Sequence, residues 1–88
     1  MRYKLLAGHE AIQAGSTNGS NFGNASLVRV FNADTTFHVI SVETSAAALV
    51  GSIHLGAGQS MDIEKNVTDE IFVDSGAAVF GTPVAQKA

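Results

Sequence analysis

The stretch from residue 56 to residue 69 constrains the fold of this chain more than any other feature. A glycine-rich turn opens it, Met61 and Ile63 then alternate with Asp62 and Glu64, and a polar turn closes it. A period of two between turns is typical of an antiparallel strand with one face in the core and one in water. The pattern therefore predicts that Met61 and Ile63 lie in the core and that the two acids are solvated.

The same pattern recurs along most of the chain. Strands are expected at residues 26–31, 36–43, 49–55, 59–65, 70–74 and 77–84, with a weaker edge strand at 2–7. No segment predicts a helix of three turns. Short strands at roughly ten-residue intervals indicate an all-β fold, a small antiparallel β-sandwich or barrel of about six to eight short strands.

Alternation within each run also predicts which side chains face the core. The core-facing residues that we expect are Val28, Val30, Ile40, Val42, Ile53 and Leu55. The opposite, outward-facing set includes Ser41, Glu43, Ser52 and His54. Pro83 has no amide hydrogen to donate, which predicts that the last strand lies at a sheet edge or that the proline is near its end.

The 88 residues are enough for one domain, and we expect residues 1–88 to form a single β domain. Residues 1–24 are expected to provide an arm, with a flexible loop rich in Asn, Ser and Gly over 15–24. The loop contains one large apolar side chain, Phe22. Two interpretations of this ring stay open: a plug folded back on the core, or an anchor inserted into a neighbouring subunit.

Charge and composition exclude several classes of partner. The net charge is −3, and the five basic residues are scattered, whereas nucleic-acid binding needs a basic stripe. No apolar run approaches the ~20 residues that span a bilayer, and the N-terminus lacks the apolar region of a signal peptide. We therefore expect synthesis in a cytosol, with no nucleic-acid and no membrane partner.

The sequence offers little for catalysis or for binding a cofactor. There is no cysteine, and no Gly-x-Ser-x-Gly elbow marks a serine nucleophile. His38 and His54 with Asp62 or Glu64 could in principle approach one another across strands, but three dispersed histidines are a weak basis for a metal site. We expect no catalytic residue, no cofactor and no metal, and hence a protein that is not an enzyme.

The phenylalanines exceed what one core face needs. Phe37 and Phe72 each lie next to a core-facing position, so strict alternation places them on the other face of their strands. Apolar side chains on both faces of a strand indicate double burial or an interface. Together with Phe22, these two rings are the predicted protein-interface residues; bulges or barrel curvature that loosen the alternation are the alternative explanation.

Several short motifs resemble those of small virion structural proteins of tailed bacteriophages. They are Leu27-Val-Arg-Val-Phe-Asn-Ala-Asp-Thr-Thr36, the run from Val50 to Lys65 containing Gly-Ala-Gly-Gln-Ser-Met-Asp-Ile-Glu-Lys, Thr68-Asp69, and the closing segment Ala77–Ala85. The resemblance covers about residues 25–85. It does not extend to the Asn/Ser/Gly loop near the N-terminus.

The resemblance implies a non-enzymatic structural protein of the virion, made in the host cytoplasm. Within that class it favours a capsid decoration, or cement, protein whose partners are the major capsid protein, copies of itself, or both. A tail, neck or fibre-attachment protein is the alternative in the same class. A ligand- or carbohydrate-binding β-sandwich module is a third possibility, although the chain has no tryptophan and a single tyrosine to form an aromatic platform.

Overall fold

The computed structural model describes residues 2–75 and 78–87, and these residues form an all-β fold. The strands are β1 (Arg2–Leu5), β2 (Glu10–Ala11), β3 (Leu27–Asn32), β4 (His38–Glu43), β5 (Leu49–Leu55), β6 (Ser60–Glu64), β7 (Glu70–Val73) and β8 (Val79–Lys87). They match the predicted strands closely, apart from the short β2. Ala77, which was expected to begin the last strand, lies outside the described residues.

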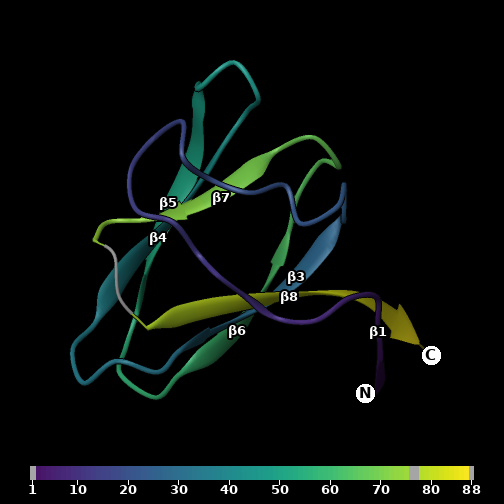
Figure 1. The fold of residues 1–88 in the computed structure, drawn as a ribbon, viewed down its shortest axis with the longest axis horizontal. Helices are drawn as coiled ribbons and strands as arrows, with labels where there is room; N and C mark the ends of the chain where they lie inside the picture. The colour runs from purple at the N-terminus through teal and green to yellow at the C-terminus, as the bar shows by residue number, and fades with distance from the viewer. Residues whose placement is uncertain (1, 76–77, 88) are drawn as a thin grey trace.

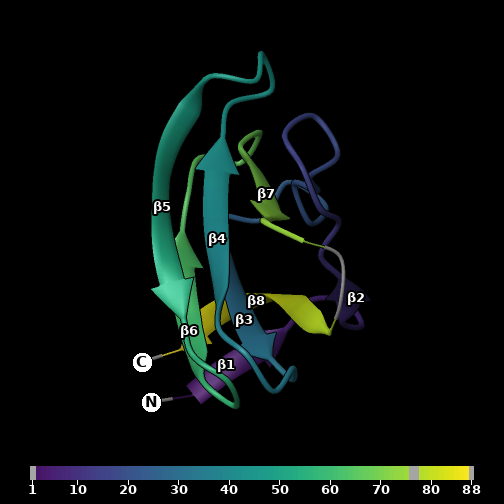
Figure 2. The same ribbon diagram turned by 90° about the vertical axis from the view of Figure 1, so that its left-hand side faces the viewer.

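The strands form two sheets that pack as a small open sandwich (Figures 1 and 2). One has the order β1-β8-β3-β6, with β2 also on β8, and the other has the order β5-β4-β7. Every strand pair is antiparallel. The fold class predicted from the sequence is therefore confirmed.

Pro83 lies in the interior of its sheet, so its predicted place at an edge was wrong. On one side of β8, Pro83 lies opposite Val28 of β3. On the other side β1 pairs as far as Val84 and β2 starts at Gly81, so Pro83 falls in the gap between the two short strands. The Leu6 amide donates to the Pro83 carbonyl there, at 3.0 Å.

The core lies between the two sheets and contains most of the side chains that alternation assigned to it. Val28, Val30, Ile40, Leu55 and Ile63 are all buried, and Val42 and Met61 pack against them from half-buried positions. Ile71, Val73 and Val79 complete the centre with no exposed surface. Ile53 is the exception: it is 48% exposed because β5 lies at the open side of the sandwich.

The described part of the N-terminal segment packs on the domain through backbone pairing. β1 and β2 both pair with β8. Residues 13–20 then run along the outer edge of β7, where Gly15 donates to the Val73 carbonyl at 3.0 Å and Ser20 exchanges two hydrogen bonds with Ile71. Backbone hydrogen bonds therefore attach this segment to the edge of β7.

Glu43 and Ser41 are buried, so their predicted exposure on the outer face of β4 was wrong. Glu43 keeps only 1% of its surface exposed. Its carboxylate accepts hydrogen bonds from the Ser16 hydroxyl at 2.6 Å and the Thr17 amide at 2.7 Å. The N-terminal segment thus covers this end of β4 and supplies the polar partners that a buried carboxylate requires.

Candidate interaction surface

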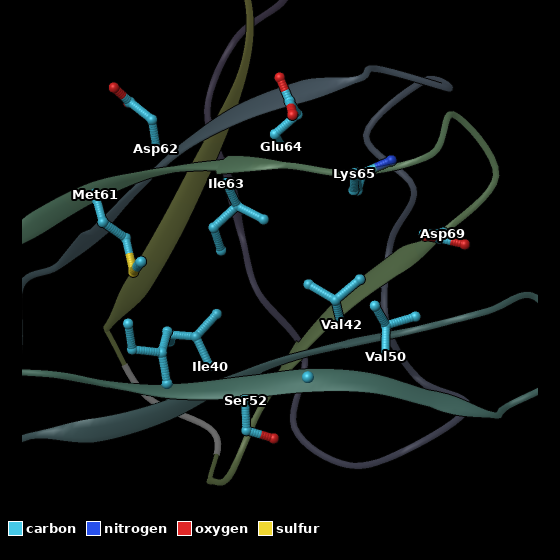
Figure 3. Close-up of a pocket in the computed structure, with 12 residues that line it drawn as sticks. Ile40, Val42, Val50, Ser52, Met61, Asp62, Ile63, Glu64, Lys65 and Asp69 are labelled. Atoms are coloured by element: carbon cyan, nitrogen blue, oxygen red, sulfur yellow. The ribbon is translucent and has the colours of Figure 1, made fainter.

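The sandwich is open along one side, where the end strand of each sheet faces the other. β5 ends the three-stranded sheet and β6 ends the five-stranded one. A cleft of about 230 Å³ lies between them. Its apolar lining is Ile40, Val42, Val50, Ile53, Met61 and Ile63 (Figure 3).

The charged side chains around this cleft do not point into it. Figure 3 shows Asp62 and Glu64 directed away from the space between the strands. Arg29 and Asp62 form an ion pair of 3.1 Å on the outer face of the five-stranded sheet. The cleft therefore presents an apolar floor with acidic groups only at its margin.

Lys65, at one end of the cleft, is a structural cation. Its side chain is buried, and Nζ donates to the carbonyls of Ala25 at 2.7 Å, Asn66 at 3.2 Å and Val67 at 3.4 Å. Burial lowers the pKa of Lys65, and the negative charge of the nearby Asp69 opposes that shift. The ammonium group thus fastens the β6–β7 turn and has its hydrogen bonds directed to backbone.

β5 is an apolar strand with most of its residues exposed. Leu49, Val50 and Ile53 keep 65%, 60% and 48% of their surface accessible. Six of the seven residues of β5 are exposed, and Leu55 alone is buried. An apolar strand exposed at a sheet edge is typical of an interaction surface.

The three predicted interface phenylalanines occupy three different environments. Phe22 is buried in the core of its own chain at 4% exposure, which corresponds to the plug alternative, and it is absent from the surface. Phe37 is 59% exposed, with its ring centroid 5.2 Å from that of His54. Phe72 is half-buried on β7 opposite Ser41, while its neighbours Ile71 and Val73 are in the core.

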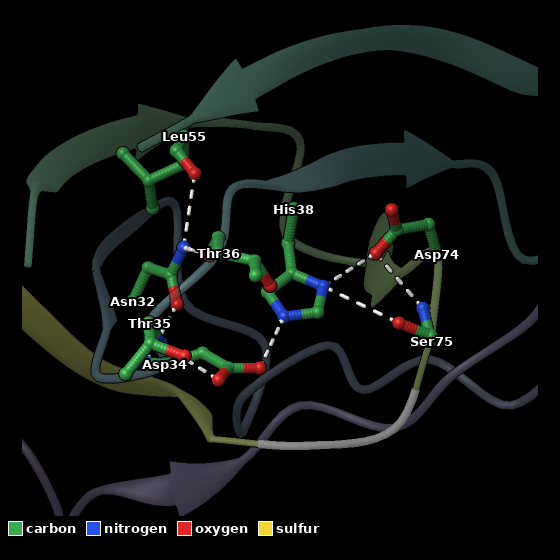
Figure 4. Close-up of polar contacts among 8 residues, drawn as sticks. All are labelled: Asn32, Asp34, Thr35, Thr36, His38, Leu55, Asp74 and Ser75. Carbon is green, nitrogen blue, oxygen red and sulfur yellow. Dashed lines mark hydrogen bonds and ion pairs between the residues drawn. The ribbon is translucent and has the colours of Figure 1, made fainter. Parts of the chain in front are cut away.

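His38 connects two loops through a pair of carboxylates (Figure 4). Its Nε2 is 2.8 Å from Asp34 in the β3–β4 loop, and its Nδ1 is 2.8 Å from Asp74 after β7. The hydrogen bond with Asp34, and then that with Asp74, raises the pKa of His38 against the opposing effect of burial. We call His38, Asp34 and Asp74 the histidine clamp.

The clamp also lowers the pKa of both carboxyl groups. The hydrogen bond with His38 is the main cause for Asp34, followed by the backbone amide of Thr35. Burial acts in the opposite direction at Asp74, but hydrogen bonds, including those from His38 and Ser75, outweigh it. The charged forms of all three clamp groups therefore stabilise one another in the folded state.

A serine lies beside this histidine, but the geometry is unlike that of a nucleophile and its base. The Ser75 hydroxyl is 3.4 Å from Nδ1 of His38, a nitrogen already 2.8 Å from Asp74. The other ring nitrogen faces Asp34. A general base needs one free nitrogen directed at the nucleophile and an orienting group on the other. The arrangement instead fits a structural connection.

Sequence reasoning missed the buried polar residues for two reasons. Ser41 and Glu43 break the alternation of β4, whereas Asn32 continues that of β3, in phase with Val28 and Val30, but is polar. Asn32 has no exposed surface and donates from Nδ2 to the carbonyls of Thr36 at 2.9 Å and Leu55 at 3.0 Å. Its Oδ1 accepts from the Asp34 amide at 2.9 Å. An Asn two residues before an Asp, at the end of an apolar strand, is a turn signal that could have located this one.

Within residues 2–75 and 78–87, no group of three or more His, Cys, Asp or Glu side chains is arranged to hold a metal ion. The same part of the chain contains no helix long and apolar enough to cross a membrane. No protein family, curated protein or solved structure matches the chain.

Proposed function

We propose that this protein is a virion structural protein of a tailed bacteriophage that decorates the capsid shell. The observation that carries the proposal is the exposed aromatic surface of the three-stranded sheet, where Phe37, just before β4, is 59% exposed. Such a surface suits a subunit that is completed by assembly. The resemblance of residues 25–85 to small virion proteins supports the same assignment.

The proposed partner is the major capsid protein. We expect it to contact the outer side of the three-stranded sheet, which we call the shell-facing surface. Phe37 is the exposed aromatic side chain on that side, and half-buried Phe72 lies on β7 of the same sheet. Many copies on a symmetric shell make individually weak contacts collectively strong. The role is non-enzymatic and requires no cofactor.

Quantitative mass spectrometry of purified particles tests the location. A copy number in proportion to the major capsid protein supports decoration of the shell. A copy number in proportion to the tail or neck proteins indicates the tail, neck or fibre-attachment alternative. Absence from the particle refutes a virion role.

A binding experiment tests the surface. Phe37→Ser should reduce occupancy on shells that lack the protein by at least about tenfold, which corresponds to about 1.4 kcal/mol. Phe31→Ser is the matched control because Phe31 is also exposed, at 43%, but lies on β3 of the other sheet. Equal loss with both variants would refute the assignment of the shell-facing surface.

A further inference from the structure

The outer edges of the three-stranded sheet are β7 and β5, and they differ in whether another part of the chain pairs with them. Along β7, residues 13–20 supply backbone partners: Val73 donates to the Gln13 carbonyl and accepts from Gly15, both at 3.0 Å. Within residues 2–75 and 78–87, β5 pairs with β4 alone. One edge is thus covered by the chain itself, and the other is left open (Figure 2).

The register of the sheet identifies the backbone groups on this open edge. The Val39 carbonyl accepts from the Asp74 amide at 3.1 Å, so the backbone of Val39 faces β7. In an antiparallel sheet, successive residues direct their backbone groups to alternate neighbours. Ile40 therefore faces β5, where its partner is Ile53.

The residues on either side of Ile53 direct their backbone groups outward by the same alternation. These are Ser52 and His54, whose amides and carbonyls lie along the open edge of β5. The pairing with β4 is regular from Leu55 to Gly51 and becomes irregular at Val50, which the register skips between Val42 and Glu43. A regular, extended edge is therefore available around Ser52 and Ile53.

β5 lacks the charged and proline residues that commonly protect an open edge, although its register is irregular at Val50. Its sequence, Leu-Val-Gly-Ser-Ile-His-Leu, contains no Lys, Arg, Asp, Glu or Pro. Charged side chains, prolines and inward-pointing charges are the usual means of preventing edge-to-edge pairing. β6, the end strand of the other sheet, has Asp62 and Glu64 exposed, so it carries the protection that β5 lacks.

We infer that β5 pairs with β5 of a second copy of this chain, antiparallel and about a twofold axis near Ser52 and Ile53. Charge selects this occupant: a strand without acidic or basic side chains meets its own copy without like-charge repulsion, although the chain has a net charge of −3. β6 would bring Asp62 and Glu64 against the same two acids of its copy. A twofold contact of one patch with itself is also the commonest way in which identical subunits associate.

The side chains of β5 suit this pairing. A Cβ built on Gly51 would meet no heavy atom within 4 Å, which leaves room for an apolar side chain of the neighbouring strand. Ile53, 48% exposed, would be covered close to the twofold axis. The two three-stranded sheets would join into one continuous sheet of six strands.

The association is expected to be reversible, with a dissociation constant in the micromolar range. One strand pair with its flanking apolar side chains buries less than the roughly 1,200–2,000 Å² of a standard stable interface. The inference does not depend on the proposed virion role. A dimer would nevertheless present two shell-facing surfaces at once, which would strengthen attachment to a symmetric shell.

Sedimentation velocity of the purified full chain, from low micromolar to near-millimolar concentration, tests the inference. The expected result is a monomer–dimer equilibrium that Ile53→Lys shifts to monomer by at least about tenfold in dissociation constant, because two lysines would meet near the axis. Val67→Lys is the matched control, since Val67 is similarly exposed at 51% but lies outside β5. It should leave the equilibrium unchanged.

A second measurement does not depend on any variant folding. Amide hydrogen exchange at Ser52 and His54 should slow as the concentration of the unmodified protein increases, because their amides become paired. A monomer at every concentration, a dimer that Ile53→Lys leaves intact, or a trimer or longer assembly would overturn the inference. Particle composition is measured separately, so failure here and failure of the virion assignment are distinguishable.

Discussion

The ring of Phe22 occupies the space in which Gly81 would otherwise carry a side chain. A Cβ built on Gly81 would lie 2.6 Å from Cζ of Phe22 and 3.2 Å from a methyl group of Val28. The loop reaches this position with Phe22 in the left-handed region, at φ 55°, which a bulky residue rarely adopts. Core packing therefore determines where this loop lies, and the absence of a side chain at residue 81 makes the packing possible.

Gly81→Ala should destabilise the fold by about 1–3 kcal/mol, because overpacking forces neighbouring side chains from their preferred positions. Denaturant unfolding of Gly81→Ala and of the unmodified protein measures the difference in their free energies of unfolding. Phe22→Leu in the same chain should recover part of the loss, giving a coupling energy in a double-mutant cycle. Gly8→Ala is the control, since a Cβ there would meet nothing within 4 Å; an equal loss from it would contradict the packing explanation.

Glu43→Gln should loosen the segment that crosses β4, because it removes the charge that strengthens the hydrogen bonds from Ser16 and Thr17. The expected cost is about 1–3 kcal/mol, with faster amide exchange at Thr17 and faster proteolysis nearby. Glu64→Gln, at an exposed position of β6, should change none of these. Unchanged exchange at Thr17 in Glu43→Gln would show that the segment is held by other contacts.

The histidine clamp predicts a dependence of stability on pH. The folded state raises the pKa of His38 above its ordinary value of 6.5, so the stabilisation is complete below that value and is lost as the pH rises through the raised one. It lowers the pKa of Asp34 and Asp74 below 3.8, so their contribution is present above 3.8 and is lost as the pH falls through the lowered values. Stability should therefore be greatest between about pH 4 and pH 6.5.

Urea unfolding across this range, with His38→Gln as the test variant, checks the assignment. The variant should flatten the fall in stability above pH 6.5 because it removes the titrating ring. His54→Gln is the comparison, since His54 is exposed on β5 and contacts Phe37. If the stability of His38→Gln fell above pH 6.5 as much as that of the unmodified protein, the histidine clamp would not be the cause of that fall.

Asn32→Asp should destabilise the fold by about 1–3 kcal/mol or more, although the two side chains are nearly the same size. The change removes the amide donor that serves the carbonyls of Thr36 and Leu55, and leaving the buried Leu55 carbonyl unsatisfied costs about 1–3 kcal/mol. The acceptor for the Asp34 amide would remain. Thermal unfolding measures the effect, and Asn66→Asp, at an exposed turn position, should be nearly neutral.

β6 illustrates what local sequence was able to predict. Ile63 is buried, Met61 packs against the core from a half-buried position, and Asp62 and Glu64 are exposed, as the alternation indicated. The same holds for Val28 and Val30 of β3. A strand at the surface of a sandwich has a period of two that is set by backbone geometry alone, so neighbours along the chain are sufficient to predict it.

Glu43 and Ile53 show where that reasoning ends. Both sit on well-predicted strands, yet the acid is buried and the isoleucine is half-exposed. Burial at these positions depends on a segment at residues 16–17 that crosses Glu43, and on β5 ending its sheet. Neither relationship is encoded within a strand, because each joins residues far apart in the chain.

Local sequence is sufficient to predict that this chain is all-β, where most of its strands run, and which side chains of β3 and β6 face the core. These follow from turn residues and from a period of two, which are local properties. The covered edges, the partners of His38 and Glu43, and the place of Phe22 in the core are visible only in the three-dimensional structure. Those features depend on contacts between distant segments, and the order of strands in two sheets brings those segments together.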